Sequence, residues 1–180
     1  MDDPFDERHL RRTAAHEASH AVAAAVLRIP FDEVTIQLSA PDGELPEGFS
    51  LGKVHRSTEM CLLSGDIEKA KLQLIQMLAG PIGERLAEPG LPPDYNQDAR
   101  DVERVLRFTF CSYELADGIA TFNPNDIAAK RNAMDDLKEE CKTLACAFVT
   151  DNFEAISAVA NLLLERGRLS AAEVIELSKN

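Results

Sequence analysis

One stretch near the N-terminus decides how the rest of the chain is read. It runs Thr13-Ala14-Ala15-His16-Glu17-Ala18-Ser19-His20-Ala21-Val22. The stretch lies within an Ala-rich run from about Asp6 to Leu27 that contains neither Gly nor Pro, and such a composition favours a long helix. Residues four apart lie on one face of a helix, one turn apart. The stretch therefore predicts a helix that presents two imidazoles on the same side.

The residue types in this helix point to metal chemistry. His-Glu-x-x-His on a helix allows both imidazoles, here His16 and His20, to bind one Zn²⁺. The carboxylate of Glu17 is placed to reach a metal-bound water rather than the metal. Glu17 can then take the proton of that water as general base and pass it to a leaving amine. The pattern predicts a zinc-dependent hydrolase of peptide bonds.

A catalytic zinc site needs a third protein ligand and an open fourth position. The longer form of the motif, with a Gly and a third His further along the helix, is absent, because Ala23 and Val26 stand at those positions. Spacing alone does not choose among the remaining candidates, which are Asp98, Asp94, Asp101, Glu84, His55 and His9. An acidic residue at position 98 would in any case be favoured by the dipole of a helix starting nearby.

The rest of the chain predicts a mainly α (α+β) fold, a helical bundle around the His-Glu-x-x-His helix with a small two- or three-stranded β element. Alternating apolar residues from Val34 to Leu38 predict a strand, and residues 49–57 predict a second, weaker one. Helical spacing follows Ile67, but Pro81 is expected to break or kink that helix. A further helix is expected from Gln97 towards Thr109.

The last third reads as helical after Asn123. Two apolar stripes are expected to be buried there: Leu137, Cys141, Leu144, Ala145 and Phe148, then Ile156, Val159, Ala160 and Leu163. Gly167 is a candidate C-cap, and Ser170 with Glu173 forms a capping box before a short final helix.

Composition bounds the function class. The chain has 180 residues, a length that suggests one domain. Its net charge of −12 argues against binding to nucleic acid or anionic lipid. No apolar run is long enough for a membrane span, and the start Met1-Asp2-Asp3 is unlike a signal peptide, so a cytoplasmic location is expected. The cysteines, Cys61, Cys111, Cys141 and Cys146, show no CxxC spacing and are expected to be buried free thiols.

The stretch from Thr13 to Val22 resembles the zinc-site helix of FtsH-type ATP-dependent metalloproteases, and the resemblance continues in order along nearly the whole chain. It is carried by Leu51-Gly52-Lys53-Val54, Leu78-Ala79-Gly80-Pro81-Ile82-Gly83-Glu84-Arg85, Asn96-Gln97-Asp98, Gly118-Ile119-Ala120-Thr121-Phe122, and the segment from Leu162 to Val174. The fourth of these is similar to a turn in the family. Residues 1–180 are thus expected to form one FtsH-like peptidase domain, with a zinc-site lobe at 1–122 and a helical part at 123–180.

The resemblance implies roles for named residues. It implies His16, His20 and Asp98 as zinc ligands and Glu17 as general base, with Asp101, one turn further on, as the rival of Asp98. Glu84 is expected either to bond a zinc-binding His or to be a plain surface or helix-pairing carboxylate. The strand around Leu51 to Val54 is expected either to hold peptide substrate by edge pairing or to be an ordinary sheet edge.

The chain also departs from the family. Ser19 replaces a Gly, Pro81 interrupts a normally continuous helix, and no ATP-binding P-loop is present. The sequence leaves open whether the chain stands alone or is part of a longer ATPase-peptidase. Expected partners are peptides or unfolded proteins, a separate ATPase or unfoldase, and further copies of the chain. The alternative function is a non-catalytic metal-binding regulatory or adaptor module, and Ni²⁺ or Co²⁺ can compete for such a site.

Overall fold

The computed structural model describes residues 7–38, 52–55, 66–89, 96–117 and 119–179. Expectations for Asp94 and Cys61, and for the parts of the second predicted strand at 49–51 and 56–57, lie outside this described part. Its elements in chain order are α1 (Glu7–Val26), β1 (Glu33–Ile36), β2 (Gly52–His55), α2 (Ile67–Ala87), α3 (Asn96–Phe110), β3 (Tyr113–Ala116), β4 (Ile119–Phe122), α4 (Pro124–Asp151), α5 (Phe153–Arg166), β5 (Arg168–Ser170) and α6 (Ala171–Leu177). The fold is mainly helical with small antiparallel sheets, which confirms the predicted fold class.

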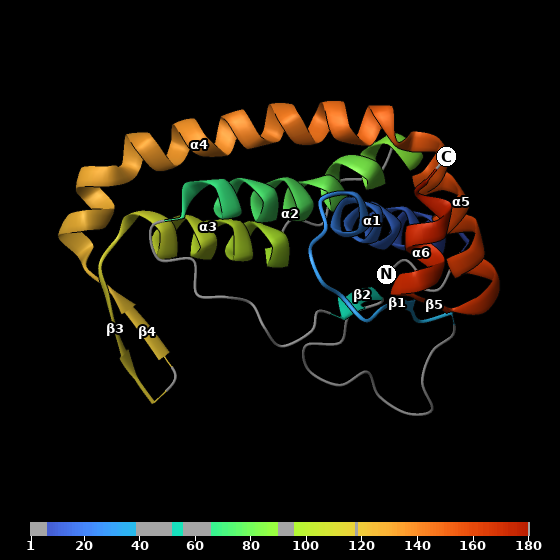
Figure 1. Cartoon of the computed structure of the whole chain (residues 1–180), viewed down its shortest axis with the longest axis horizontal. Helices are drawn as coiled ribbons and strands as arrows, with labels where there is room; N and C mark the ends of the chain where they lie inside the picture. The colour runs from blue at the N-terminus through green and yellow to red at the C-terminus, as the bar shows by residue number, and fades with distance from the viewer. Residues whose placement is uncertain (1–6, 39–51, 56–65, 90–95, 118, 180) are drawn as a thin grey trace.

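Helix α1 lies at the centre of the helical packing. It contacts α2 along one side and α5 along another, while α4 extends across α2 and α3 (Figure 1). Ten of its residues are buried, and most of these are Ala. Small side chains let neighbouring helices approach closely, so the Ala-rich composition that favours the helix also allows it to be enclosed.

Two hydrophobic clusters hold the helices together. One joins α1, β1, α5 and α6, with Val22, Val34 and Leu163 among its fully buried members. The other joins α2, α3 and α4 around Leu74, Leu106 and Met134. The α1–α2 contact bridges the two clusters, and His16 and His20 lie there. The predicted division of the domain into a zinc-site lobe at 1–122 and a helical part at 123–180 stays a prediction.

A three-stranded antiparallel sheet lies beside α1, in the order β2-β1-β5. Val34 of β1 pairs with Val54 on one side and with Leu169 on the other. The sequence predicted the first two strands, whereas β5 arrives from the far end of the chain. Gly167 precedes it as a left-handed C-cap, and Ser170, its last residue, begins the predicted capping box of α6.

Several expectations are wrong in detail. The helix is not broken at Pro81, because α2 continues from Ile67 to Ala87 with Pro81 buried inside it, while the other expectation, a kink at Pro81, stays a prediction. Residues 119–122 form β4 of a projecting hairpin with β3, not a turn (Figure 1). On α4, Leu144 and Cys146 are exposed, because the buried face follows Met134, Cys141 and Val149.

No helix in the described part of the chain is long and apolar enough to cross a membrane by itself. Helices α4 and α5 meet the length and composition criteria only as a pair, and that pair is bent by 74°.

Helices α1 and α2 approach each other closely where Ser19 faces Gly83. The Ser19 hydroxyl donates to the carbonyl of Ala15 at 2.7 Å, the back-bond expected of a serine within a helix. A Cβ atom added at Gly83 would overlap Ser19 Oγ. The two positions therefore share one small space, in which only one of them has room for a side chain.

We expect Gly83→Ala to lower the free energy of unfolding by about 1–3 kcal/mol, the usual cost of overpacking. Ser19→Gly in the same chain should recover most of this loss, because it removes the overlapping atoms. Urea unfolding of both single variants and the double variant gives the coupling between them. Additive losses would show that the two helices do not meet at this pair.

Candidate metal centre

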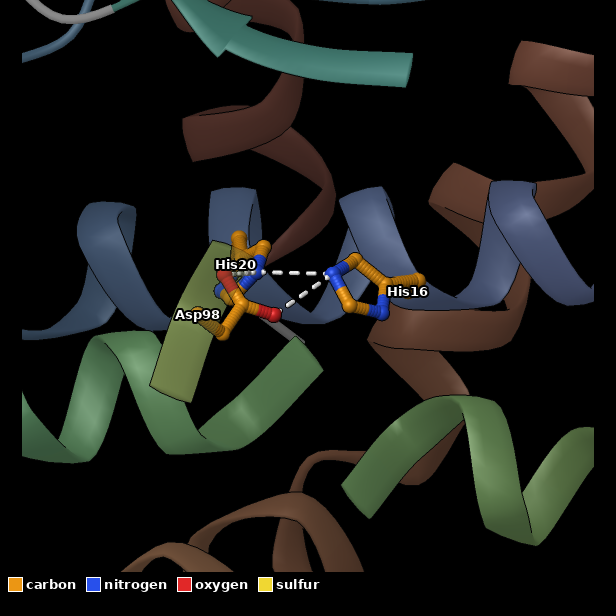
Figure 2. A group of neighbouring side chains, drawn as sticks. All are labelled: His16, His20 and Asp98. Carbon is orange, nitrogen blue, oxygen red and sulfur yellow. Dashed lines mark hydrogen bonds and ion pairs between the residues drawn. The ribbon is translucent and has the colours of Figure 1, made fainter. Parts of the chain in front are cut away.

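The two histidines of α1 converge as their spacing predicts. His16 and His20 lie one turn apart, and their rings meet edge to face with centroids 4.7 Å apart. Their Nε2 atoms are 3.1 Å from each other. Figure 2 shows both rings directed towards the same point beside the helix.

Asp98 reaches the same point from α3. Its Oδ2 lies 3.0 Å from Nε2 of His16, and its Oδ1 lies 3.5 Å from Nε2 of His20 (Figure 2). Donors bound to zinc at 2.0–2.2 Å in a tetrahedron are separated by about 3.3 Å, and the distances between the two Nε2 atoms and from each of them to an Asp98 oxygen are close to this value. All three ligand atoms lie within 4.8 Å of one another. The donor set, two imidazoles and a carboxylate, also fits zinc.

Each imidazole is fixed from behind by a partner on α2. Nδ1 of His16 lies 2.8 Å from Glu84 Oε2, and Nδ1 of His20 donates to the backbone carbonyl of Gln76 at 2.7 Å. Such contacts orient the ring of a metal-binding His and direct its other nitrogen outward. Glu84 was expected either to contact a zinc-binding His or to be a plain surface or helix-pairing carboxylate. The contact with His16 is present in the fold.

The carboxylates around His16 change the pKa values of the group. Burial lowers the pKa of His16, but hydrogen bonds with Asp98 and Glu84 and the charge of Glu17 outweigh it and raise the pKa to about 10. Burial raises the pKa of Asp98, yet its contacts with His16 and His20 hold that pKa well below its usual range. Without metal, the centre thus holds a charged imidazolium between ionised carboxylates.

This electrostatic arrangement predicts how the metal-free protein responds to pH. The pKa of His16 rises from 6.5 in the unfolded chain to about 10 in the folded one, so the native state binds the extra proton between these values. The contribution of His16 to stability is complete below pH 6.5 and disappears as the pH rises towards 10. We expect urea unfolding in chelator to show this loss and His16→Asn to remove it. A His16-dependent slope of the opposite sign would contradict the electrostatic assignment.

Glu17 lies next to the donor set without belonging to it. Its side chain is 8% exposed, and β2 packs directly over it, since a Cβ atom at Gly52 would overlap Glu17 Cγ. Gly52 therefore allows the edge strand to approach the carboxylate. Glu17 is not among the clustered ligand atoms, which are those of His16, His20 and Asp98 in the described residues.

A second glycine creates the space for His20. A Cβ atom at Gly80 would overlap the His20 imidazole, so α2 passes this ring with its bare backbone. That close approach brings the carbonyl of Gln76 within hydrogen-bonding distance of the ring.

The other candidate ligands are placed elsewhere. His55 on β2 lies 3.1 Å from the Thr35 hydroxyl, and Glu84 contacts the back of His16. Asp101 and His9 are outside the clustered group, and Asp94 lies beyond the described residues. Two groups that support the ligands were not identified in the sequence analysis. They are Arg12, whose guanidinium lies 2.6 Å from Glu84, and the Gln76 carbonyl behind His20. Arg12 precedes His16 by four residues, a signal that could have been noticed, whereas a backbone carbonyl leaves none.

Comparison with known proteins gives distant relatives. No protein-family model matches the chain. The ATP-dependent zinc metalloprotease FtsH of Magnetococcus marinus is 29% identical over 200 residues, covering 96% of this chain and 28% of that protein. The ATP-dependent zinc metalloprotease FtsH 4 of Sorangium cellulosum is 26% identical over 195 residues, covering 94% of this chain and 29% of that protein. The chain therefore spans less than a third of either relative, and the likeness supports an FtsH-like relationship.

Proposed function

We propose that this chain is a zinc-dependent endopeptidase domain of the FtsH type, with His16, His20 and Asp98 as metal ligands. One observation carries the proposal: ligand atoms from two helices converge while each imidazole is held from behind by α2. The two zinc metalloprotease relatives support the same reading.

The catalytic roles divide between the metal and Glu17. Zinc, when bound, supplies a Lewis acid that acidifies a water molecule and polarises the peptide carbonyl. Glu17 accepts the proton of the attacking water and returns it to the leaving amine. Its burial beneath β2 holds this carboxylate beside the ligands and shields it from bulk water.

The edge strand β2 supplies a place for substrate. It is the outermost strand of the order β2-β1-β5, and within the described residues only β1 pairs with it. An extended peptide can add to such an edge through main-chain hydrogen bonds. Because Gly52 of this strand contacts Glu17, a peptide bound there would pass close to the general base.

The proposed substrates are peptides and unfolded proteins. An extended segment is needed to pair with β2, and the sequence contains no ATP-binding P-loop to drive unfolding. The relatives are named as ATP-dependent enzymes. We therefore assign the unfolding of structured substrates to an ATPase or unfoldase outside residues 1–180, with assembly of several copies as a further proposal.

Digestion of casein, an unstructured protein, tests the proposed activity. We expect the purified chain to cleave casein, a chelator to stop cleavage, and added zinc to restore it. A folded protein of similar size should remain intact under the same conditions. Stoichiometric zinc without chelator-sensitive cleavage would instead favour the non-catalytic metal-binding module.

A further inference from the structure

A buried ion pair lies directly behind the first histidine. The guanidinium of Arg12 donates to Oε1 of Glu84 at 2.6 Å, while Oε2 of the same carboxylate lies 2.8 Å from Nδ1 of His16. The Arg12 and Glu84 side chains are 12% and 5% exposed. Glu84 thus bridges two residues that lie one turn apart on α1, and each of its oxygens has its own partner.

This arrangement has a consequence for His16. A guanidinium stays charged at any ordinary pH, and its contact holds the neighbouring carboxylate ionised and fixed in position. An ionised carboxylate can only accept a hydrogen bond, so Nδ1 of His16 must carry the proton. When His16 gives up its other proton to bind a metal ion, the lone pair is therefore on Nε2, the atom that faces Asp98 and His20.

We propose that Arg12 is a positioning residue of the metal centre, which acts through Glu84 to fix the orientation and tautomer of His16. The inference rests on the proposed zinc function and adds to it a residue that touches neither metal nor substrate. Removing Arg12 would take away the charge that orients the Glu84 carboxylate, and the partner behind His16 would be held less firmly.

The same two helices provide a matched control. Arg8 and Glu88 form a second Arg–Glu pair at 3.1 Å, and each lies four residues from the corresponding member of the first pair. The Arg8 side chain is 51% exposed, and its pair is one turn further from the ligands along α1. Loss of Arg8 therefore removes an α1–α2 ion pair of the same chemistry without removing the contact behind His16.

The test is the dissociation constant for Zn²⁺, measured by competition with a chelating dye on folded protein. We expect Arg12→Met to weaken zinc binding about 10-fold, within the range typical of residues behind metal ligands. Arg8→Met should change it less than about 2-fold, since exposed ion pairs contribute little. Arg12→Lys should recover most of the affinity by restoring the charge. In a Glu84→Gln background, Arg12→Met should have no further effect.

Thermal unfolding in chelator separates this role from a structural one. A merely structural Arg12 would lower the melting temperature of the metal-free protein and leave the zinc affinity of the folded fraction unchanged. That result would overturn the proposed role of Arg12 but not the proposed zinc function. The same holds if Arg12→Met weakens zinc binding as strongly in the Glu84→Gln background as in the parent. Absence of zinc binding by the parent protein would overturn the proposed function together with the role of Arg12. If Arg12→Met does not fold, Arg12→Gln removes the charge and keeps a donor, and the same criteria apply.

Discussion

Glu17→Gln should reduce casein cleavage by about 10²- to 10⁴-fold, the usual contribution of a general base, while leaving zinc bound. The amide has nearly the shape of the carboxylate, so it should fit beneath β2 at Gly52. It cannot accept a proton from water, and the rate therefore falls without loss of the metal. Initial rates and zinc content measured on the same preparations separate these two effects.

Glu7→Gln provides the control for this prediction. Glu7 lies on the same helix, but its side chain is 80% exposed and pairs with Arg11. Its replacement should leave the cleavage rate unchanged within about 2-fold, because exposed pairs are worth little. Cleavage by Glu17→Gln at the parental rate would remove Glu17 from the mechanism.

Asp98→Asn should weaken zinc binding by more than about 100-fold, beyond the range expected for residues that only support a ligand. The neutral amide keeps the size of the side chain but loses the charge that neutralises the ion and the nearby His16. Cleavage should fall with the metal. Titration with Zn²⁺ in the presence of a competing chelator measures the change.

Asp101→Asn is the matched comparison, since it removes the same charge one turn further along α3. Asp101 is outside the clustered ligand atoms, so its replacement should leave zinc affinity nearly unchanged. The reverse pattern, with loss of zinc affinity at Asp101 and retention at Asp98, would contradict the assignment of Asp98 and point to Asp101 as the third ligand.

The parts of the centre that sequence could predict are those contained in one helix. His16, Glu17 and His20 lie within five consecutive positions, and helical geometry alone brings both rings to one face. Asp98 lies on another helix, 78 residues beyond His20, so spacing left it among six candidates. Only the folded arrangement, in which α3 packs against α2 and α4, brings Asp98 to the two histidines and leaves Asp101 outside the clustered group.

Tertiary packing also explains where the fold differs from expectation. Pro81 has the local properties of a helix breaker, yet α2 continues through it because Gly80 and Gly83 allow close packing against α1. The third strand of the main sheet follows α5 and pairs with β1 at Thr35–Arg168, a contact across more than 130 residues. Neither outcome has a local signal in the sequence.

The metal content of protein purified without added metal tests the centre most directly. If His16, His20 and Asp98 form a zinc site, elemental analysis of the parent chain should find about one zinc per chain. The variant His16→Ala/His20→Ala should contain almost none while retaining its helical circular dichroism. A parent protein without stoichiometric metal, or a double variant with undiminished zinc, would contradict the assignment of these residues as a zinc centre.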